Sequence, residues 1–540
     1  MIACVSSGSS SLQARRGCKC RNVLRSALLS AVIAMNGWSV GQTSANAQAT
    51  NPPAPPPDNV QVNPTVDKYF LKNKQNEPAL AQNPRNPLNL VVGANDSYAE
   101  PECTDATPSK CSLSLTTSIS GFYTSFDGGR TWSFGGLIDL SGFGDYAYGD
   151  PSLAFDRQGN AYYATLAFPD KSPPGASPSD LFVARSTDGG QTFTFVTKAS
   201  GDSQGIFDDK DSIAVGPDPG NPSQDNIYVA WTKLSGGGSH PNQILFARST
   251  DGGATWAKPL QLSPADTTVT TFRTGAAVKV GPDGTVYVIW LNTKGAPGIF
   301  MTTSRDGGKT FLPPGQIITV APVNDDGLPL SGASFRQTGR LFPSLSIGPD
   351  GTLYVVWCSH TNNHADVWAT RSTDGGITWS TPVHAGHLDN QSAFFASVSA
   401  DPRNKDKVNV IFQAMDDVSS GTKPGAGIVH YDSFFTQSTD GGATFGVAQR
   451  ISTMRSDPDG SSLNGLQQQF LGDYITAVSD SQGSRVFAVW TDARNASPCA
   501  AVDAYRAALA AGVSATAPDV ITQCSKAFGN TDIYFSGVNY

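Results

Sequence analysis

Carboxylates and a tyrosine stand just ahead of several short apolar runs in this 540-residue chain. The candidates for catalytic chemistry are Asp150, Asp211, Asp473 and Tyr474. A pair of carboxylates can serve as general acid and general base. A tyrosine can act as a nucleophile when a neighbouring base takes its proton. These residue types therefore predict proton-transfer chemistry, provided that the fold brings them together.

Arginines occupy comparable positions and are candidates for binding a substrate. The candidates are Arg273, Arg340 and Arg494, with Arg336 beside Arg340. A guanidinium group is a planar fork that can donate two parallel hydrogen bonds to a carboxylate. The alternative to a functional role, for any one of these residues, is a side chain that only hydrogen-bonds a loop backbone.

One repeated octapeptide, Ser-x-Asp-Gly-Gly-x-Thr-Trp/Phe, indicates which strands and loops position the candidate carboxylates, tyrosine and arginines. It occurs six times, with aspartates at 127, 188, 251, 306, 374 and 440. Asp-Gly-Gly tolerates positive φ and supplies a carboxylate that accepts backbone N–H bonds, so each copy predicts a tight β-hairpin. Before each copy run strand-like segments such as Leu353–Trp357 and Val367–Arg371. Four strands per repeat predict one propeller blade.

The octapeptide resembles the Asp-box, or BNR repeat, of the sialidase-like β-propeller superfamily. The resemblance implies an all-β propeller of four-stranded antiparallel blades, in which the boxes are architectural and lie away from the functional face. First strands begin near Pro78, Pro151, Asp211, Gly275, Pro343, Phe394 and Asp473, which predicts seven blades, with six as the alternative. The segment Asn59–Asn63 is expected to pair with 532–540 and close the ring, so that no sheet edge stays free.

In a propeller the loops that enter the innermost strands line one face, so the candidates above are expected to share it. Sialidases of the superfamily use an arginine cluster, a tyrosine nucleophile with a glutamate base, and an aspartate acid/base. In that family the first arginine lies in a Phe/Tyr-Arg-Ile-Pro motif before the first box, and this sequence has no such motif. The three glutamates, Glu77, Glu100 and Glu102, all lie in the first unit. The standard exo-sialidase mechanism is therefore not expected. Asp150 with Asp211 or Asp473 is the alternative pair, for a glycosidase that uses two aspartates.

Two functions follow from this interpretation. The first is a sialidase-like propeller that acts on or binds extracellular glycans or glycoproteins, with or without catalysis. The second is a non-catalytic scaffold that binds another protein through its rim. A cleft with converging arginines and paired carboxylates favours the first, and a flat apolar rim favours the second.

The first 49 residues have the order of a secretory signal peptide: a basic run, an apolar stretch and small residues. A Pro-rich leader follows at 50–58, and 59–540 is predicted to be one propeller domain. No later stretch has the length of a transmembrane helix, so the mature chain is expected to be secreted or periplasmic. Removing five positive residues takes the formal charge from -8 to -13, which disfavours nucleic acid as a partner.

Five cysteines follow the predicted signal peptide. Cys103–Cys111 and Cys499–Cys524 are the expected disulfides, and Cys358 is expected to be a buried thiol. An insertion at about 495–529 is expected to carry one helix that includes Tyr505–Ala511, pinned by Cys524.

No cofactor is expected. Asp208–Asp211 is a weak candidate for calcium, since hard cations bind carboxylate oxygens. His360 and His364 are spaced by four residues, but a solvated loop is the favoured interpretation of that segment over a metal site.

Overall fold

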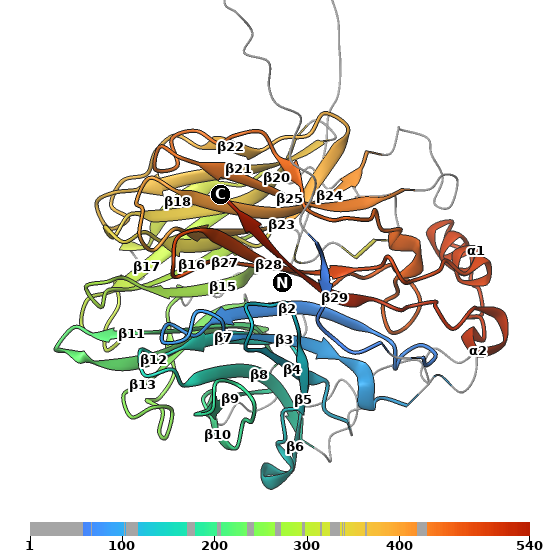
Figure 1. Ribbon diagram of the computed structural model, residues 1–540, viewed down its shortest axis with the longest axis horizontal. Coiled ribbons are helices and arrows are strands. Elements are labelled where there is room, and N and C mark those ends of the chain that lie inside the picture. Colours follow the sequence, from blue (N-terminus) through green and yellow to red (C-terminus); the bar gives the residue numbers. More distant parts are fainter. Residues whose placement is uncertain are drawn as a thin grey trace, which may run out of the picture. The chain divides into compact units, whose positions relative to one another are not determined.

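Seven antiparallel sheets form the blades of a seven-bladed β-propeller in the computed structural model, which confirms the predicted fold (Figure 1). The structure describes residues 58–65, 67–101, 103, 117–169, 179–201, 207–234, 242–264, 272–293, 297–313, 316–324, 335–336, 339, 341–361, 364–417 and 429–540.

Blades 1 to 4 follow one another along the chain, each running from the innermost strand outward. The strands are β2 (Gln75–Gln82), β3 (Leu90–Asp96), β4 (Ser120–Ser125) and β5 (Ser133–Leu137) in blade 1; β6 (Asp145–Ala147) with β7 (Ser152–Phe155), β8 (Ala161–Pro169), β9 (Asp180–Ser186) and β10 (Phe195–Lys198) in blade 2; β11 (Phe207–Asp218), β12 (Asn221–Leu234), β13 (Gln243–Ser249) and β14 (Leu260–Gln261) in blade 3; and β15 (Arg273–Val280), β16 (Val286–Asn292), β17 (Gly298–Ser304) and β18 (Ile318–Pro322) in blade 4.

Blades 5 to 7 repeat the same order. The strands are β19 (Ser344–Ile347), β20 (Leu353–Thr361), β21 (His364–Ser372) and β22 (Val383–Gly386) in blade 5; β23 (Gln391–Ala400), β24 (Val408–Asp416), β25 (Tyr431–Ser438) and β26 (Gln449–Arg450) in blade 6; and β27 (Thr476–Ser479), β28 (Arg485–Asp492), β29 (Asp532–Asn539) and β1 (Val60–Gln61) in blade 7.

All six Asp-boxes make the same hairpin between the third and fourth strands of a blade. In the first box the Asp127 carboxylate accepts hydrogen bonds from the Thr131 hydroxyl at 2.7 Å and the Thr131 N–H at 2.9 Å. The Ser125 hydroxyl donates to Asp127 and accepts from the Gly129 N–H. Because strands alternate in direction, the boxes lie at the end of the blades opposite the starts of the innermost strands. The boxes are therefore architectural.

We expect Asp440→Ala, in the sixth box, to lower the free energy of unfolding by about 1–2 kcal/mol, because several small hydrogen-bond contributions are lost together. Although partial burial opposes it, donors on Thr444, Ser438 and Ala443 lower the pKa of Asp440 to about 2, so the carboxylate is charged in all ordinary buffers. Urea unfolding of both proteins measures the change. An unchanged midpoint would mean that water replaces these bonds at no cost.

In five of the six boxes the second glycine allows close contact with the preceding blade. A Cβ on Gly129 would lie 2.2 Å from the Phe535 ring, and one on Gly190 would lie 2.3 Å from Val91. The aromatic residue of the box packs across the same boundary, as Trp132 does against Phe535 with ring centres 5.3 Å apart. Buried clusters therefore lie between neighbouring blades, and one of them joins β28 and β29 of blade 7 to β3 of blade 1.

The two ends of the described chain close the ring, as the sequence predicts. β1 pairs antiparallel with β29, Val60 opposite Phe535. The Val62 N–H donates to the Ile533 carbonyl at 2.8 Å. The buried Asn63 side chain donates to Asp532 and accepts from the Ile533 N–H, both at 2.7 Å. The last blade is thus built from both ends of the propeller.

The insertion in blade 7 holds two helices, α1 (Ala500–Ala510) and α2 (Val520–Gln523), where one was expected. The predicted Cys499–Cys524 disulfide joins them, with an S–S distance of 2.02 Å. The buried Arg506 side chain of α1 donates to the carbonyls of Ser461 and Leu466. The insertion thereby braces the segment that leads into the innermost strand of blade 7.

Some sequence-based expectations fall outside the described residues, namely the signal peptide at 1–49, most of the leader, and Cys111 of the expected Cys103–Cys111 pair. Cys358 is buried in β20. None of the helices in the described part of the chain is long and apolar enough to span a membrane.

Candidate functional site

The innermost strands of four blades each contain an irregularity of the hydrogen-bond ladder. The ladder shifts register between Asn76 and Ala79, between Asp209 and Ser212, between Thr274 and Ala277, and between Phe394 and Ser397. Residues at these irregularities have left-handed backbone conformations: Glu77 (φ 57), Lys210 (φ 46), Gly275 (φ 67), Phe395 (φ 52) and, between β6 and β7, Asp150 (φ 51). β-Bulges re-aim side chains, and backbone strain of this kind gathers at functional sites.

The strands begin earlier than predicted at several of these positions. Asp208–Asp211 and Arg273 therefore lie within β11 and β15 rather than in loops ahead of them.

Asp150 is the centre of a carboxylate cluster that three blades build. It accepts a hydrogen bond from the Lys210 N–H at 3.1 Å and shares side-chain hydrogen bonds with Glu77 and Asp209. Asn95 ties the same residues together, since its amide donates to Glu77 at 2.7 Å and its carbonyl accepts from the Asp150 N–H at 2.9 Å. Blades 1, 2 and 3 each supply one carboxyl group.

The flanking carboxyls of this cluster resist ionisation. Burial, followed by the charges of Asp150 and Asp473, raises the pKa of Glu77 and that of Asp209 well above their usual ranges. Carboxyl groups that keep their protons near neutral pH can act as general acids. The cluster therefore offers proton donors beside the Asp150 carboxylate.

Asp473 and Tyr474 reach the cluster from blade 7. Asp473 accepts a hydrogen bond from Arg336 at 3.0 Å and another from the Gly339 N–H at 3.1 Å. Burial raises the pKa of Asp473, and Arg336 opposes that rise. The Tyr474 hydroxyl donates to the Pro151 carbonyl at 3.3 Å, and the Lys210 ammonium lies 3.9 Å from its ring centre.

Glu77 lies close enough to Tyr474 to influence its charge, although all three glutamates belong to the first unit of the sequence. A Cβ on Gly472 (φ 90) would lie 2.6 Å from Glu77 Cγ, so the backbone just before Tyr474 touches this side chain. Burial, Asp150 and Glu77 together raise the pKa of Tyr474 well above its usual range. Ring closure makes the first and last blades neighbours, and that predicted closure was the available signal for Glu77.

Asp211 lies within the bulge, between Asp209 and Ser212, and is fully buried. Ser152 donates to one of its oxygens at 2.5 Å, and the other makes no hydrogen bond among the described residues. Burial outweighs the Ser152 and Lys210 contributions and raises the pKa of Asp211 to about 7. Asp209 faces Asp150 instead, so the carboxylates of the weak calcium candidate Asp208–Asp211 have different partners.

The raised pKa of Asp211 makes the free energy of unfolding depend on pH. Between the unfolded pKa near 3.8 and the folded pKa near 7, the native state binds more protons than the unfolded state, so the unfolding free energy falls as pH rises through that window. Between about pH 5 and about pH 8 that fall amounts to roughly 2–3 kcal/mol, and we expect Asp211→Asn to remove it. Urea unfolding of both proteins at about pH 5 and about pH 8 measures the difference. Identical pH profiles would contradict the assignment.

A central cavity adjoins the cluster, although Glu77, Asp150, Asp209 and Asp473 are not among its lining residues. A cavity of about 180 Å³ is lined by the innermost segments of all seven blades, and Lys210, Asp211 and Tyr474 line it. The structure brings Asp150, Asp211, Asp473 and Tyr474 close enough to influence one another's charge.

The predicted arginines do not converge in the described structure. The buried Arg273 donates to the carbonyls of Asn242 and Pro264. Arg494 pairs with Asp492 at 2.7 Å and covers the Tyr534 ring. Arg340 lies outside the described residues, and its neighbour Arg336 is the arginine that joins the carboxylates.

Comparisons with known proteins agree with this architecture. Residues 214–409 match the BNR repeat-like domain family. No curated protein matches the sequence. The chain thus carries six Asp-boxes on a seven-bladed β-propeller, and its central part is similar to the BNR repeat-like family.

Similar solved structures include a Hadza microbial sialidase, at 17% identity and a TM-score of 0.40, covering 80% of this chain and 75% of that one. A protein of unknown function from Dyadobacter fermentans has 16% identity and a TM-score of 0.41, covering 89% and 98%. A Penicillium chrysogenum alpha-L-arabinanase has 13% identity and a TM-score of 0.42, covering 66% and 92%. At such low identities the chemistry has to be argued from this chain's own residues.

Proposed function

We propose that this propeller is an exported glycoside hydrolase whose acid/base chemistry resides in the cluster of Glu77, Asp150, Asp209 and Asp473. The observation that carries the proposal is the convergence of these four carboxyls, three of them at irregularities of the innermost strands, with Tyr474 and Lys210 beside them. Ion pairs that only stabilise a fold do not require buried carboxyls to share hydrogen bonds. Perturbed titration in a concave site is typical of catalysis.

The roles follow from protonation. Because the pKa of Glu77 and that of Asp209 are raised well above their usual ranges, either can protonate the glycosidic oxygen of the leaving group. The Asp150 carboxylate, hydrogen-bonded to both, can take a proton from the attacking group. That group is water or the Tyr474 hydroxyl, whose raised pKa makes a neighbouring base necessary.

The charge of the site favours an uncharged sugar over a sialoside. Its guanidinium, Arg336, already pairs with Asp473. Burial lowers the pKa of the neighbouring Lys74 to about 7, which weakens it as a second cation. An anionic sugar would meet four carboxyl groups and no arginine free of a carboxylate partner at this cluster among the described residues.

A screen of chromogenic glycosides tests the proposal. Neutral pentosides and hexosides and a sialoside are offered to the purified protein, to Asp150→Asn, and to Asp440→Asn as a control in an Asp-box at the opposite end of the blades. We expect cleavage of a neutral glycoside that Asp150→Asn loses and Asp440→Asn keeps. Cleavage of the sialoside alone would refute the substrate class. No cleavage of any substrate would favour the non-catalytic scaffold.

A further inference from the structure

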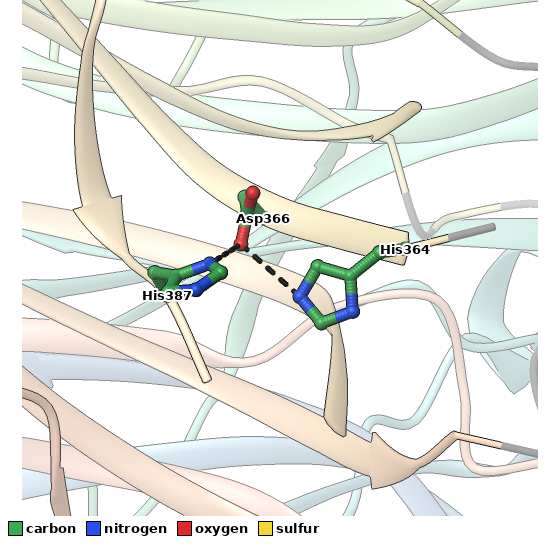
Figure 2. A group of neighbouring side chains, drawn as sticks. All are labelled: His364, Asp366 and His387. Atoms are coloured by element: carbon green, nitrogen blue, oxygen red, sulfur yellow. Dashed lines mark hydrogen bonds and ion pairs between the residues drawn. The ribbon is translucent and has the colours of Figure 1, made fainter. Parts of the chain in front are cut away.

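Three of the six histidines of the chain surround one carboxylate, Asp366, at the edge of blade 5. Asp366 Oδ1 lies 2.7 Å from His387 Nδ1 and 3.4 Å from His364 Nε2 (Figure 2). His384 Nδ1 lies 3.5 Å from the other oxygen. None of these residues belongs to the carboxylate cluster around Asp150.

The fold itself creates this group. His364 and Asp366 are two residues apart in β21, so their side chains share one face of the strand. His387 directly follows β22, which pairs with β21 through Val367 opposite Gly386. Two neighbouring strands therefore present an imidazole, a carboxylate and a second imidazole side by side.

We propose that His364 Nε2, Asp366 Oδ1 and His387 Nδ1 bind a divalent transition-metal ion, with Zn²⁺ as the ion that this donor set suits best. These three atoms lie within 4.8 Å of one another. Ligand atoms around a tetrahedral zinc are about 3.3–3.4 Å apart, given zinc–ligand distances of about 2.0–2.1 Å. The His364–Asp366 distance already matches, and the shorter His387–Asp366 distance has to widen as the ion replaces the shared proton.

The histidine nitrogens that face away from the proposed ion are held by carboxylates. His364 Nδ1 lies 3.0 Å from Asp417 Oδ2, and His387 Nε2 lies 3.3 Å from Asp389 Oδ1. Metal-binding histidines commonly place their second ring nitrogen against a carboxylate, which fixes the ring and increases its basicity. The inward-facing His364 Nε2 is buried and makes no hydrogen bond among the described residues. These contacts are a second observation that points to a metal site, separate from the identity of the three ligands.

The ligand types narrow the choice of ion. Two imidazoles and one carboxylate suit zinc and its neighbours, whereas calcium and magnesium prefer oxygen ligands alone. Three protein ligands leave the remaining coordination position to water. The His387 side chain is 53% exposed, so solvent reaches the ion directly.

The site differs from the histidine pair that the sequence suggested. His360 is buried in β20 opposite Ala365 and is not one of the three ligands. The spacing of four residues is helical, whereas the segment is a strand hairpin in which residues two apart share a face. The third ligand comes from the next strand, which periodicity within one segment cannot reveal.

Isothermal titration of the chelator-treated protein with ZnCl₂ tests the proposal. We expect one Zn²⁺ per chain, and visible absorption bands of low-symmetry Co²⁺ when cobalt replaces zinc. Removing a ligand in His387→Ala should abolish this binding. Asp417→Asn, which keeps the ligands, should weaken it by about 10- to 100-fold. His430→Ala is the matched control, since this nearby histidine lies 3.8 Å from Asp416 and not at Asp366.

Circular dichroism checks that each variant is folded. Because protons compete for the same imidazole nitrogens, the affinity should also fall as the pH is lowered. A zinc isotherm that His387→Ala leaves unchanged would overturn the proposal, as would a wild-type protein that binds less than one ion per chain.

Discussion

Glu77→Gln is expected to lower the turnover of a responsive glycoside by about 10²- to 10⁴-fold, the usual contribution of a positioned acid or base. Glutamine fills the same volume, and its side-chain carbonyl can still accept the hydrogen bond that Asn95 donates to Glu77 at 2.7 Å. What it lacks is a proton that can be transferred. The effect should therefore fall on kcat and leave the fold intact.

Stability provides an internal check on that result. Because burial raises the pKa of Glu77 well above its usual range, ionisation at high pH costs the folded state free energy. Glutamine resembles the protonated acid, so the variant should be as stable as the wild type below the usual glutamate pKa and increasingly more stable as the pH rises from there towards the raised pKa of Glu77. Steady-state kinetics and urea unfolding at several pH values measure both effects. Turnover within about threefold of wild type, in a folded variant, would remove Glu77 from the chemistry.

Deletion of β1 is expected to have the largest effect on stability. A chain that begins at Pro64 loses the Val60–Phe535 and Gln61–Tyr534 pairs with β29 and the buried Val62 side chain. It also loses Asn63, which leaves the buried Asp532 without one of its donors. Burial of one valine and abandoned buried polar groups together predict a loss of roughly 3–6 kcal/mol.

The deletion also leaves β29 as an unpaired sheet edge, which favours aggregation. The matched control begins at Asp58 and keeps β1, so it should unfold like the full-length protein. Urea midpoints and light scattering compare the three chains. If the chain that begins at Pro64 unfolded at the same midpoint and stayed monomeric, closure by β1 would contribute nothing to the ring.

Much of the architecture is local and could therefore be predicted. Each box is a hairpin whose hydrogen bonds join residues no more than four apart, such as Ser125, Asp127 and Thr131. Six such hairpins at blade-sized intervals predicted the repeat, and the leftover strands Asn59–Asn63 and 532–540 predicted the closed seven-bladed ring. The disulfide between Cys499 and Cys524 was also predictable, because the pair staples a single insertion.

The sequence by itself determined the fold class, the blade count and the closure, and it indicated Asp150, Asp211, Asp473 and Tyr474 as candidates. Only the tertiary structure placed Glu77 against Gly472, two residues before Tyr474, and brought His387 to His364 and Asp366. The reason is physical. Hairpin geometry is set by neighbours in the chain, whereas these contacts depend on bulges that re-aim side chains and on strands paired across blades or within a sheet.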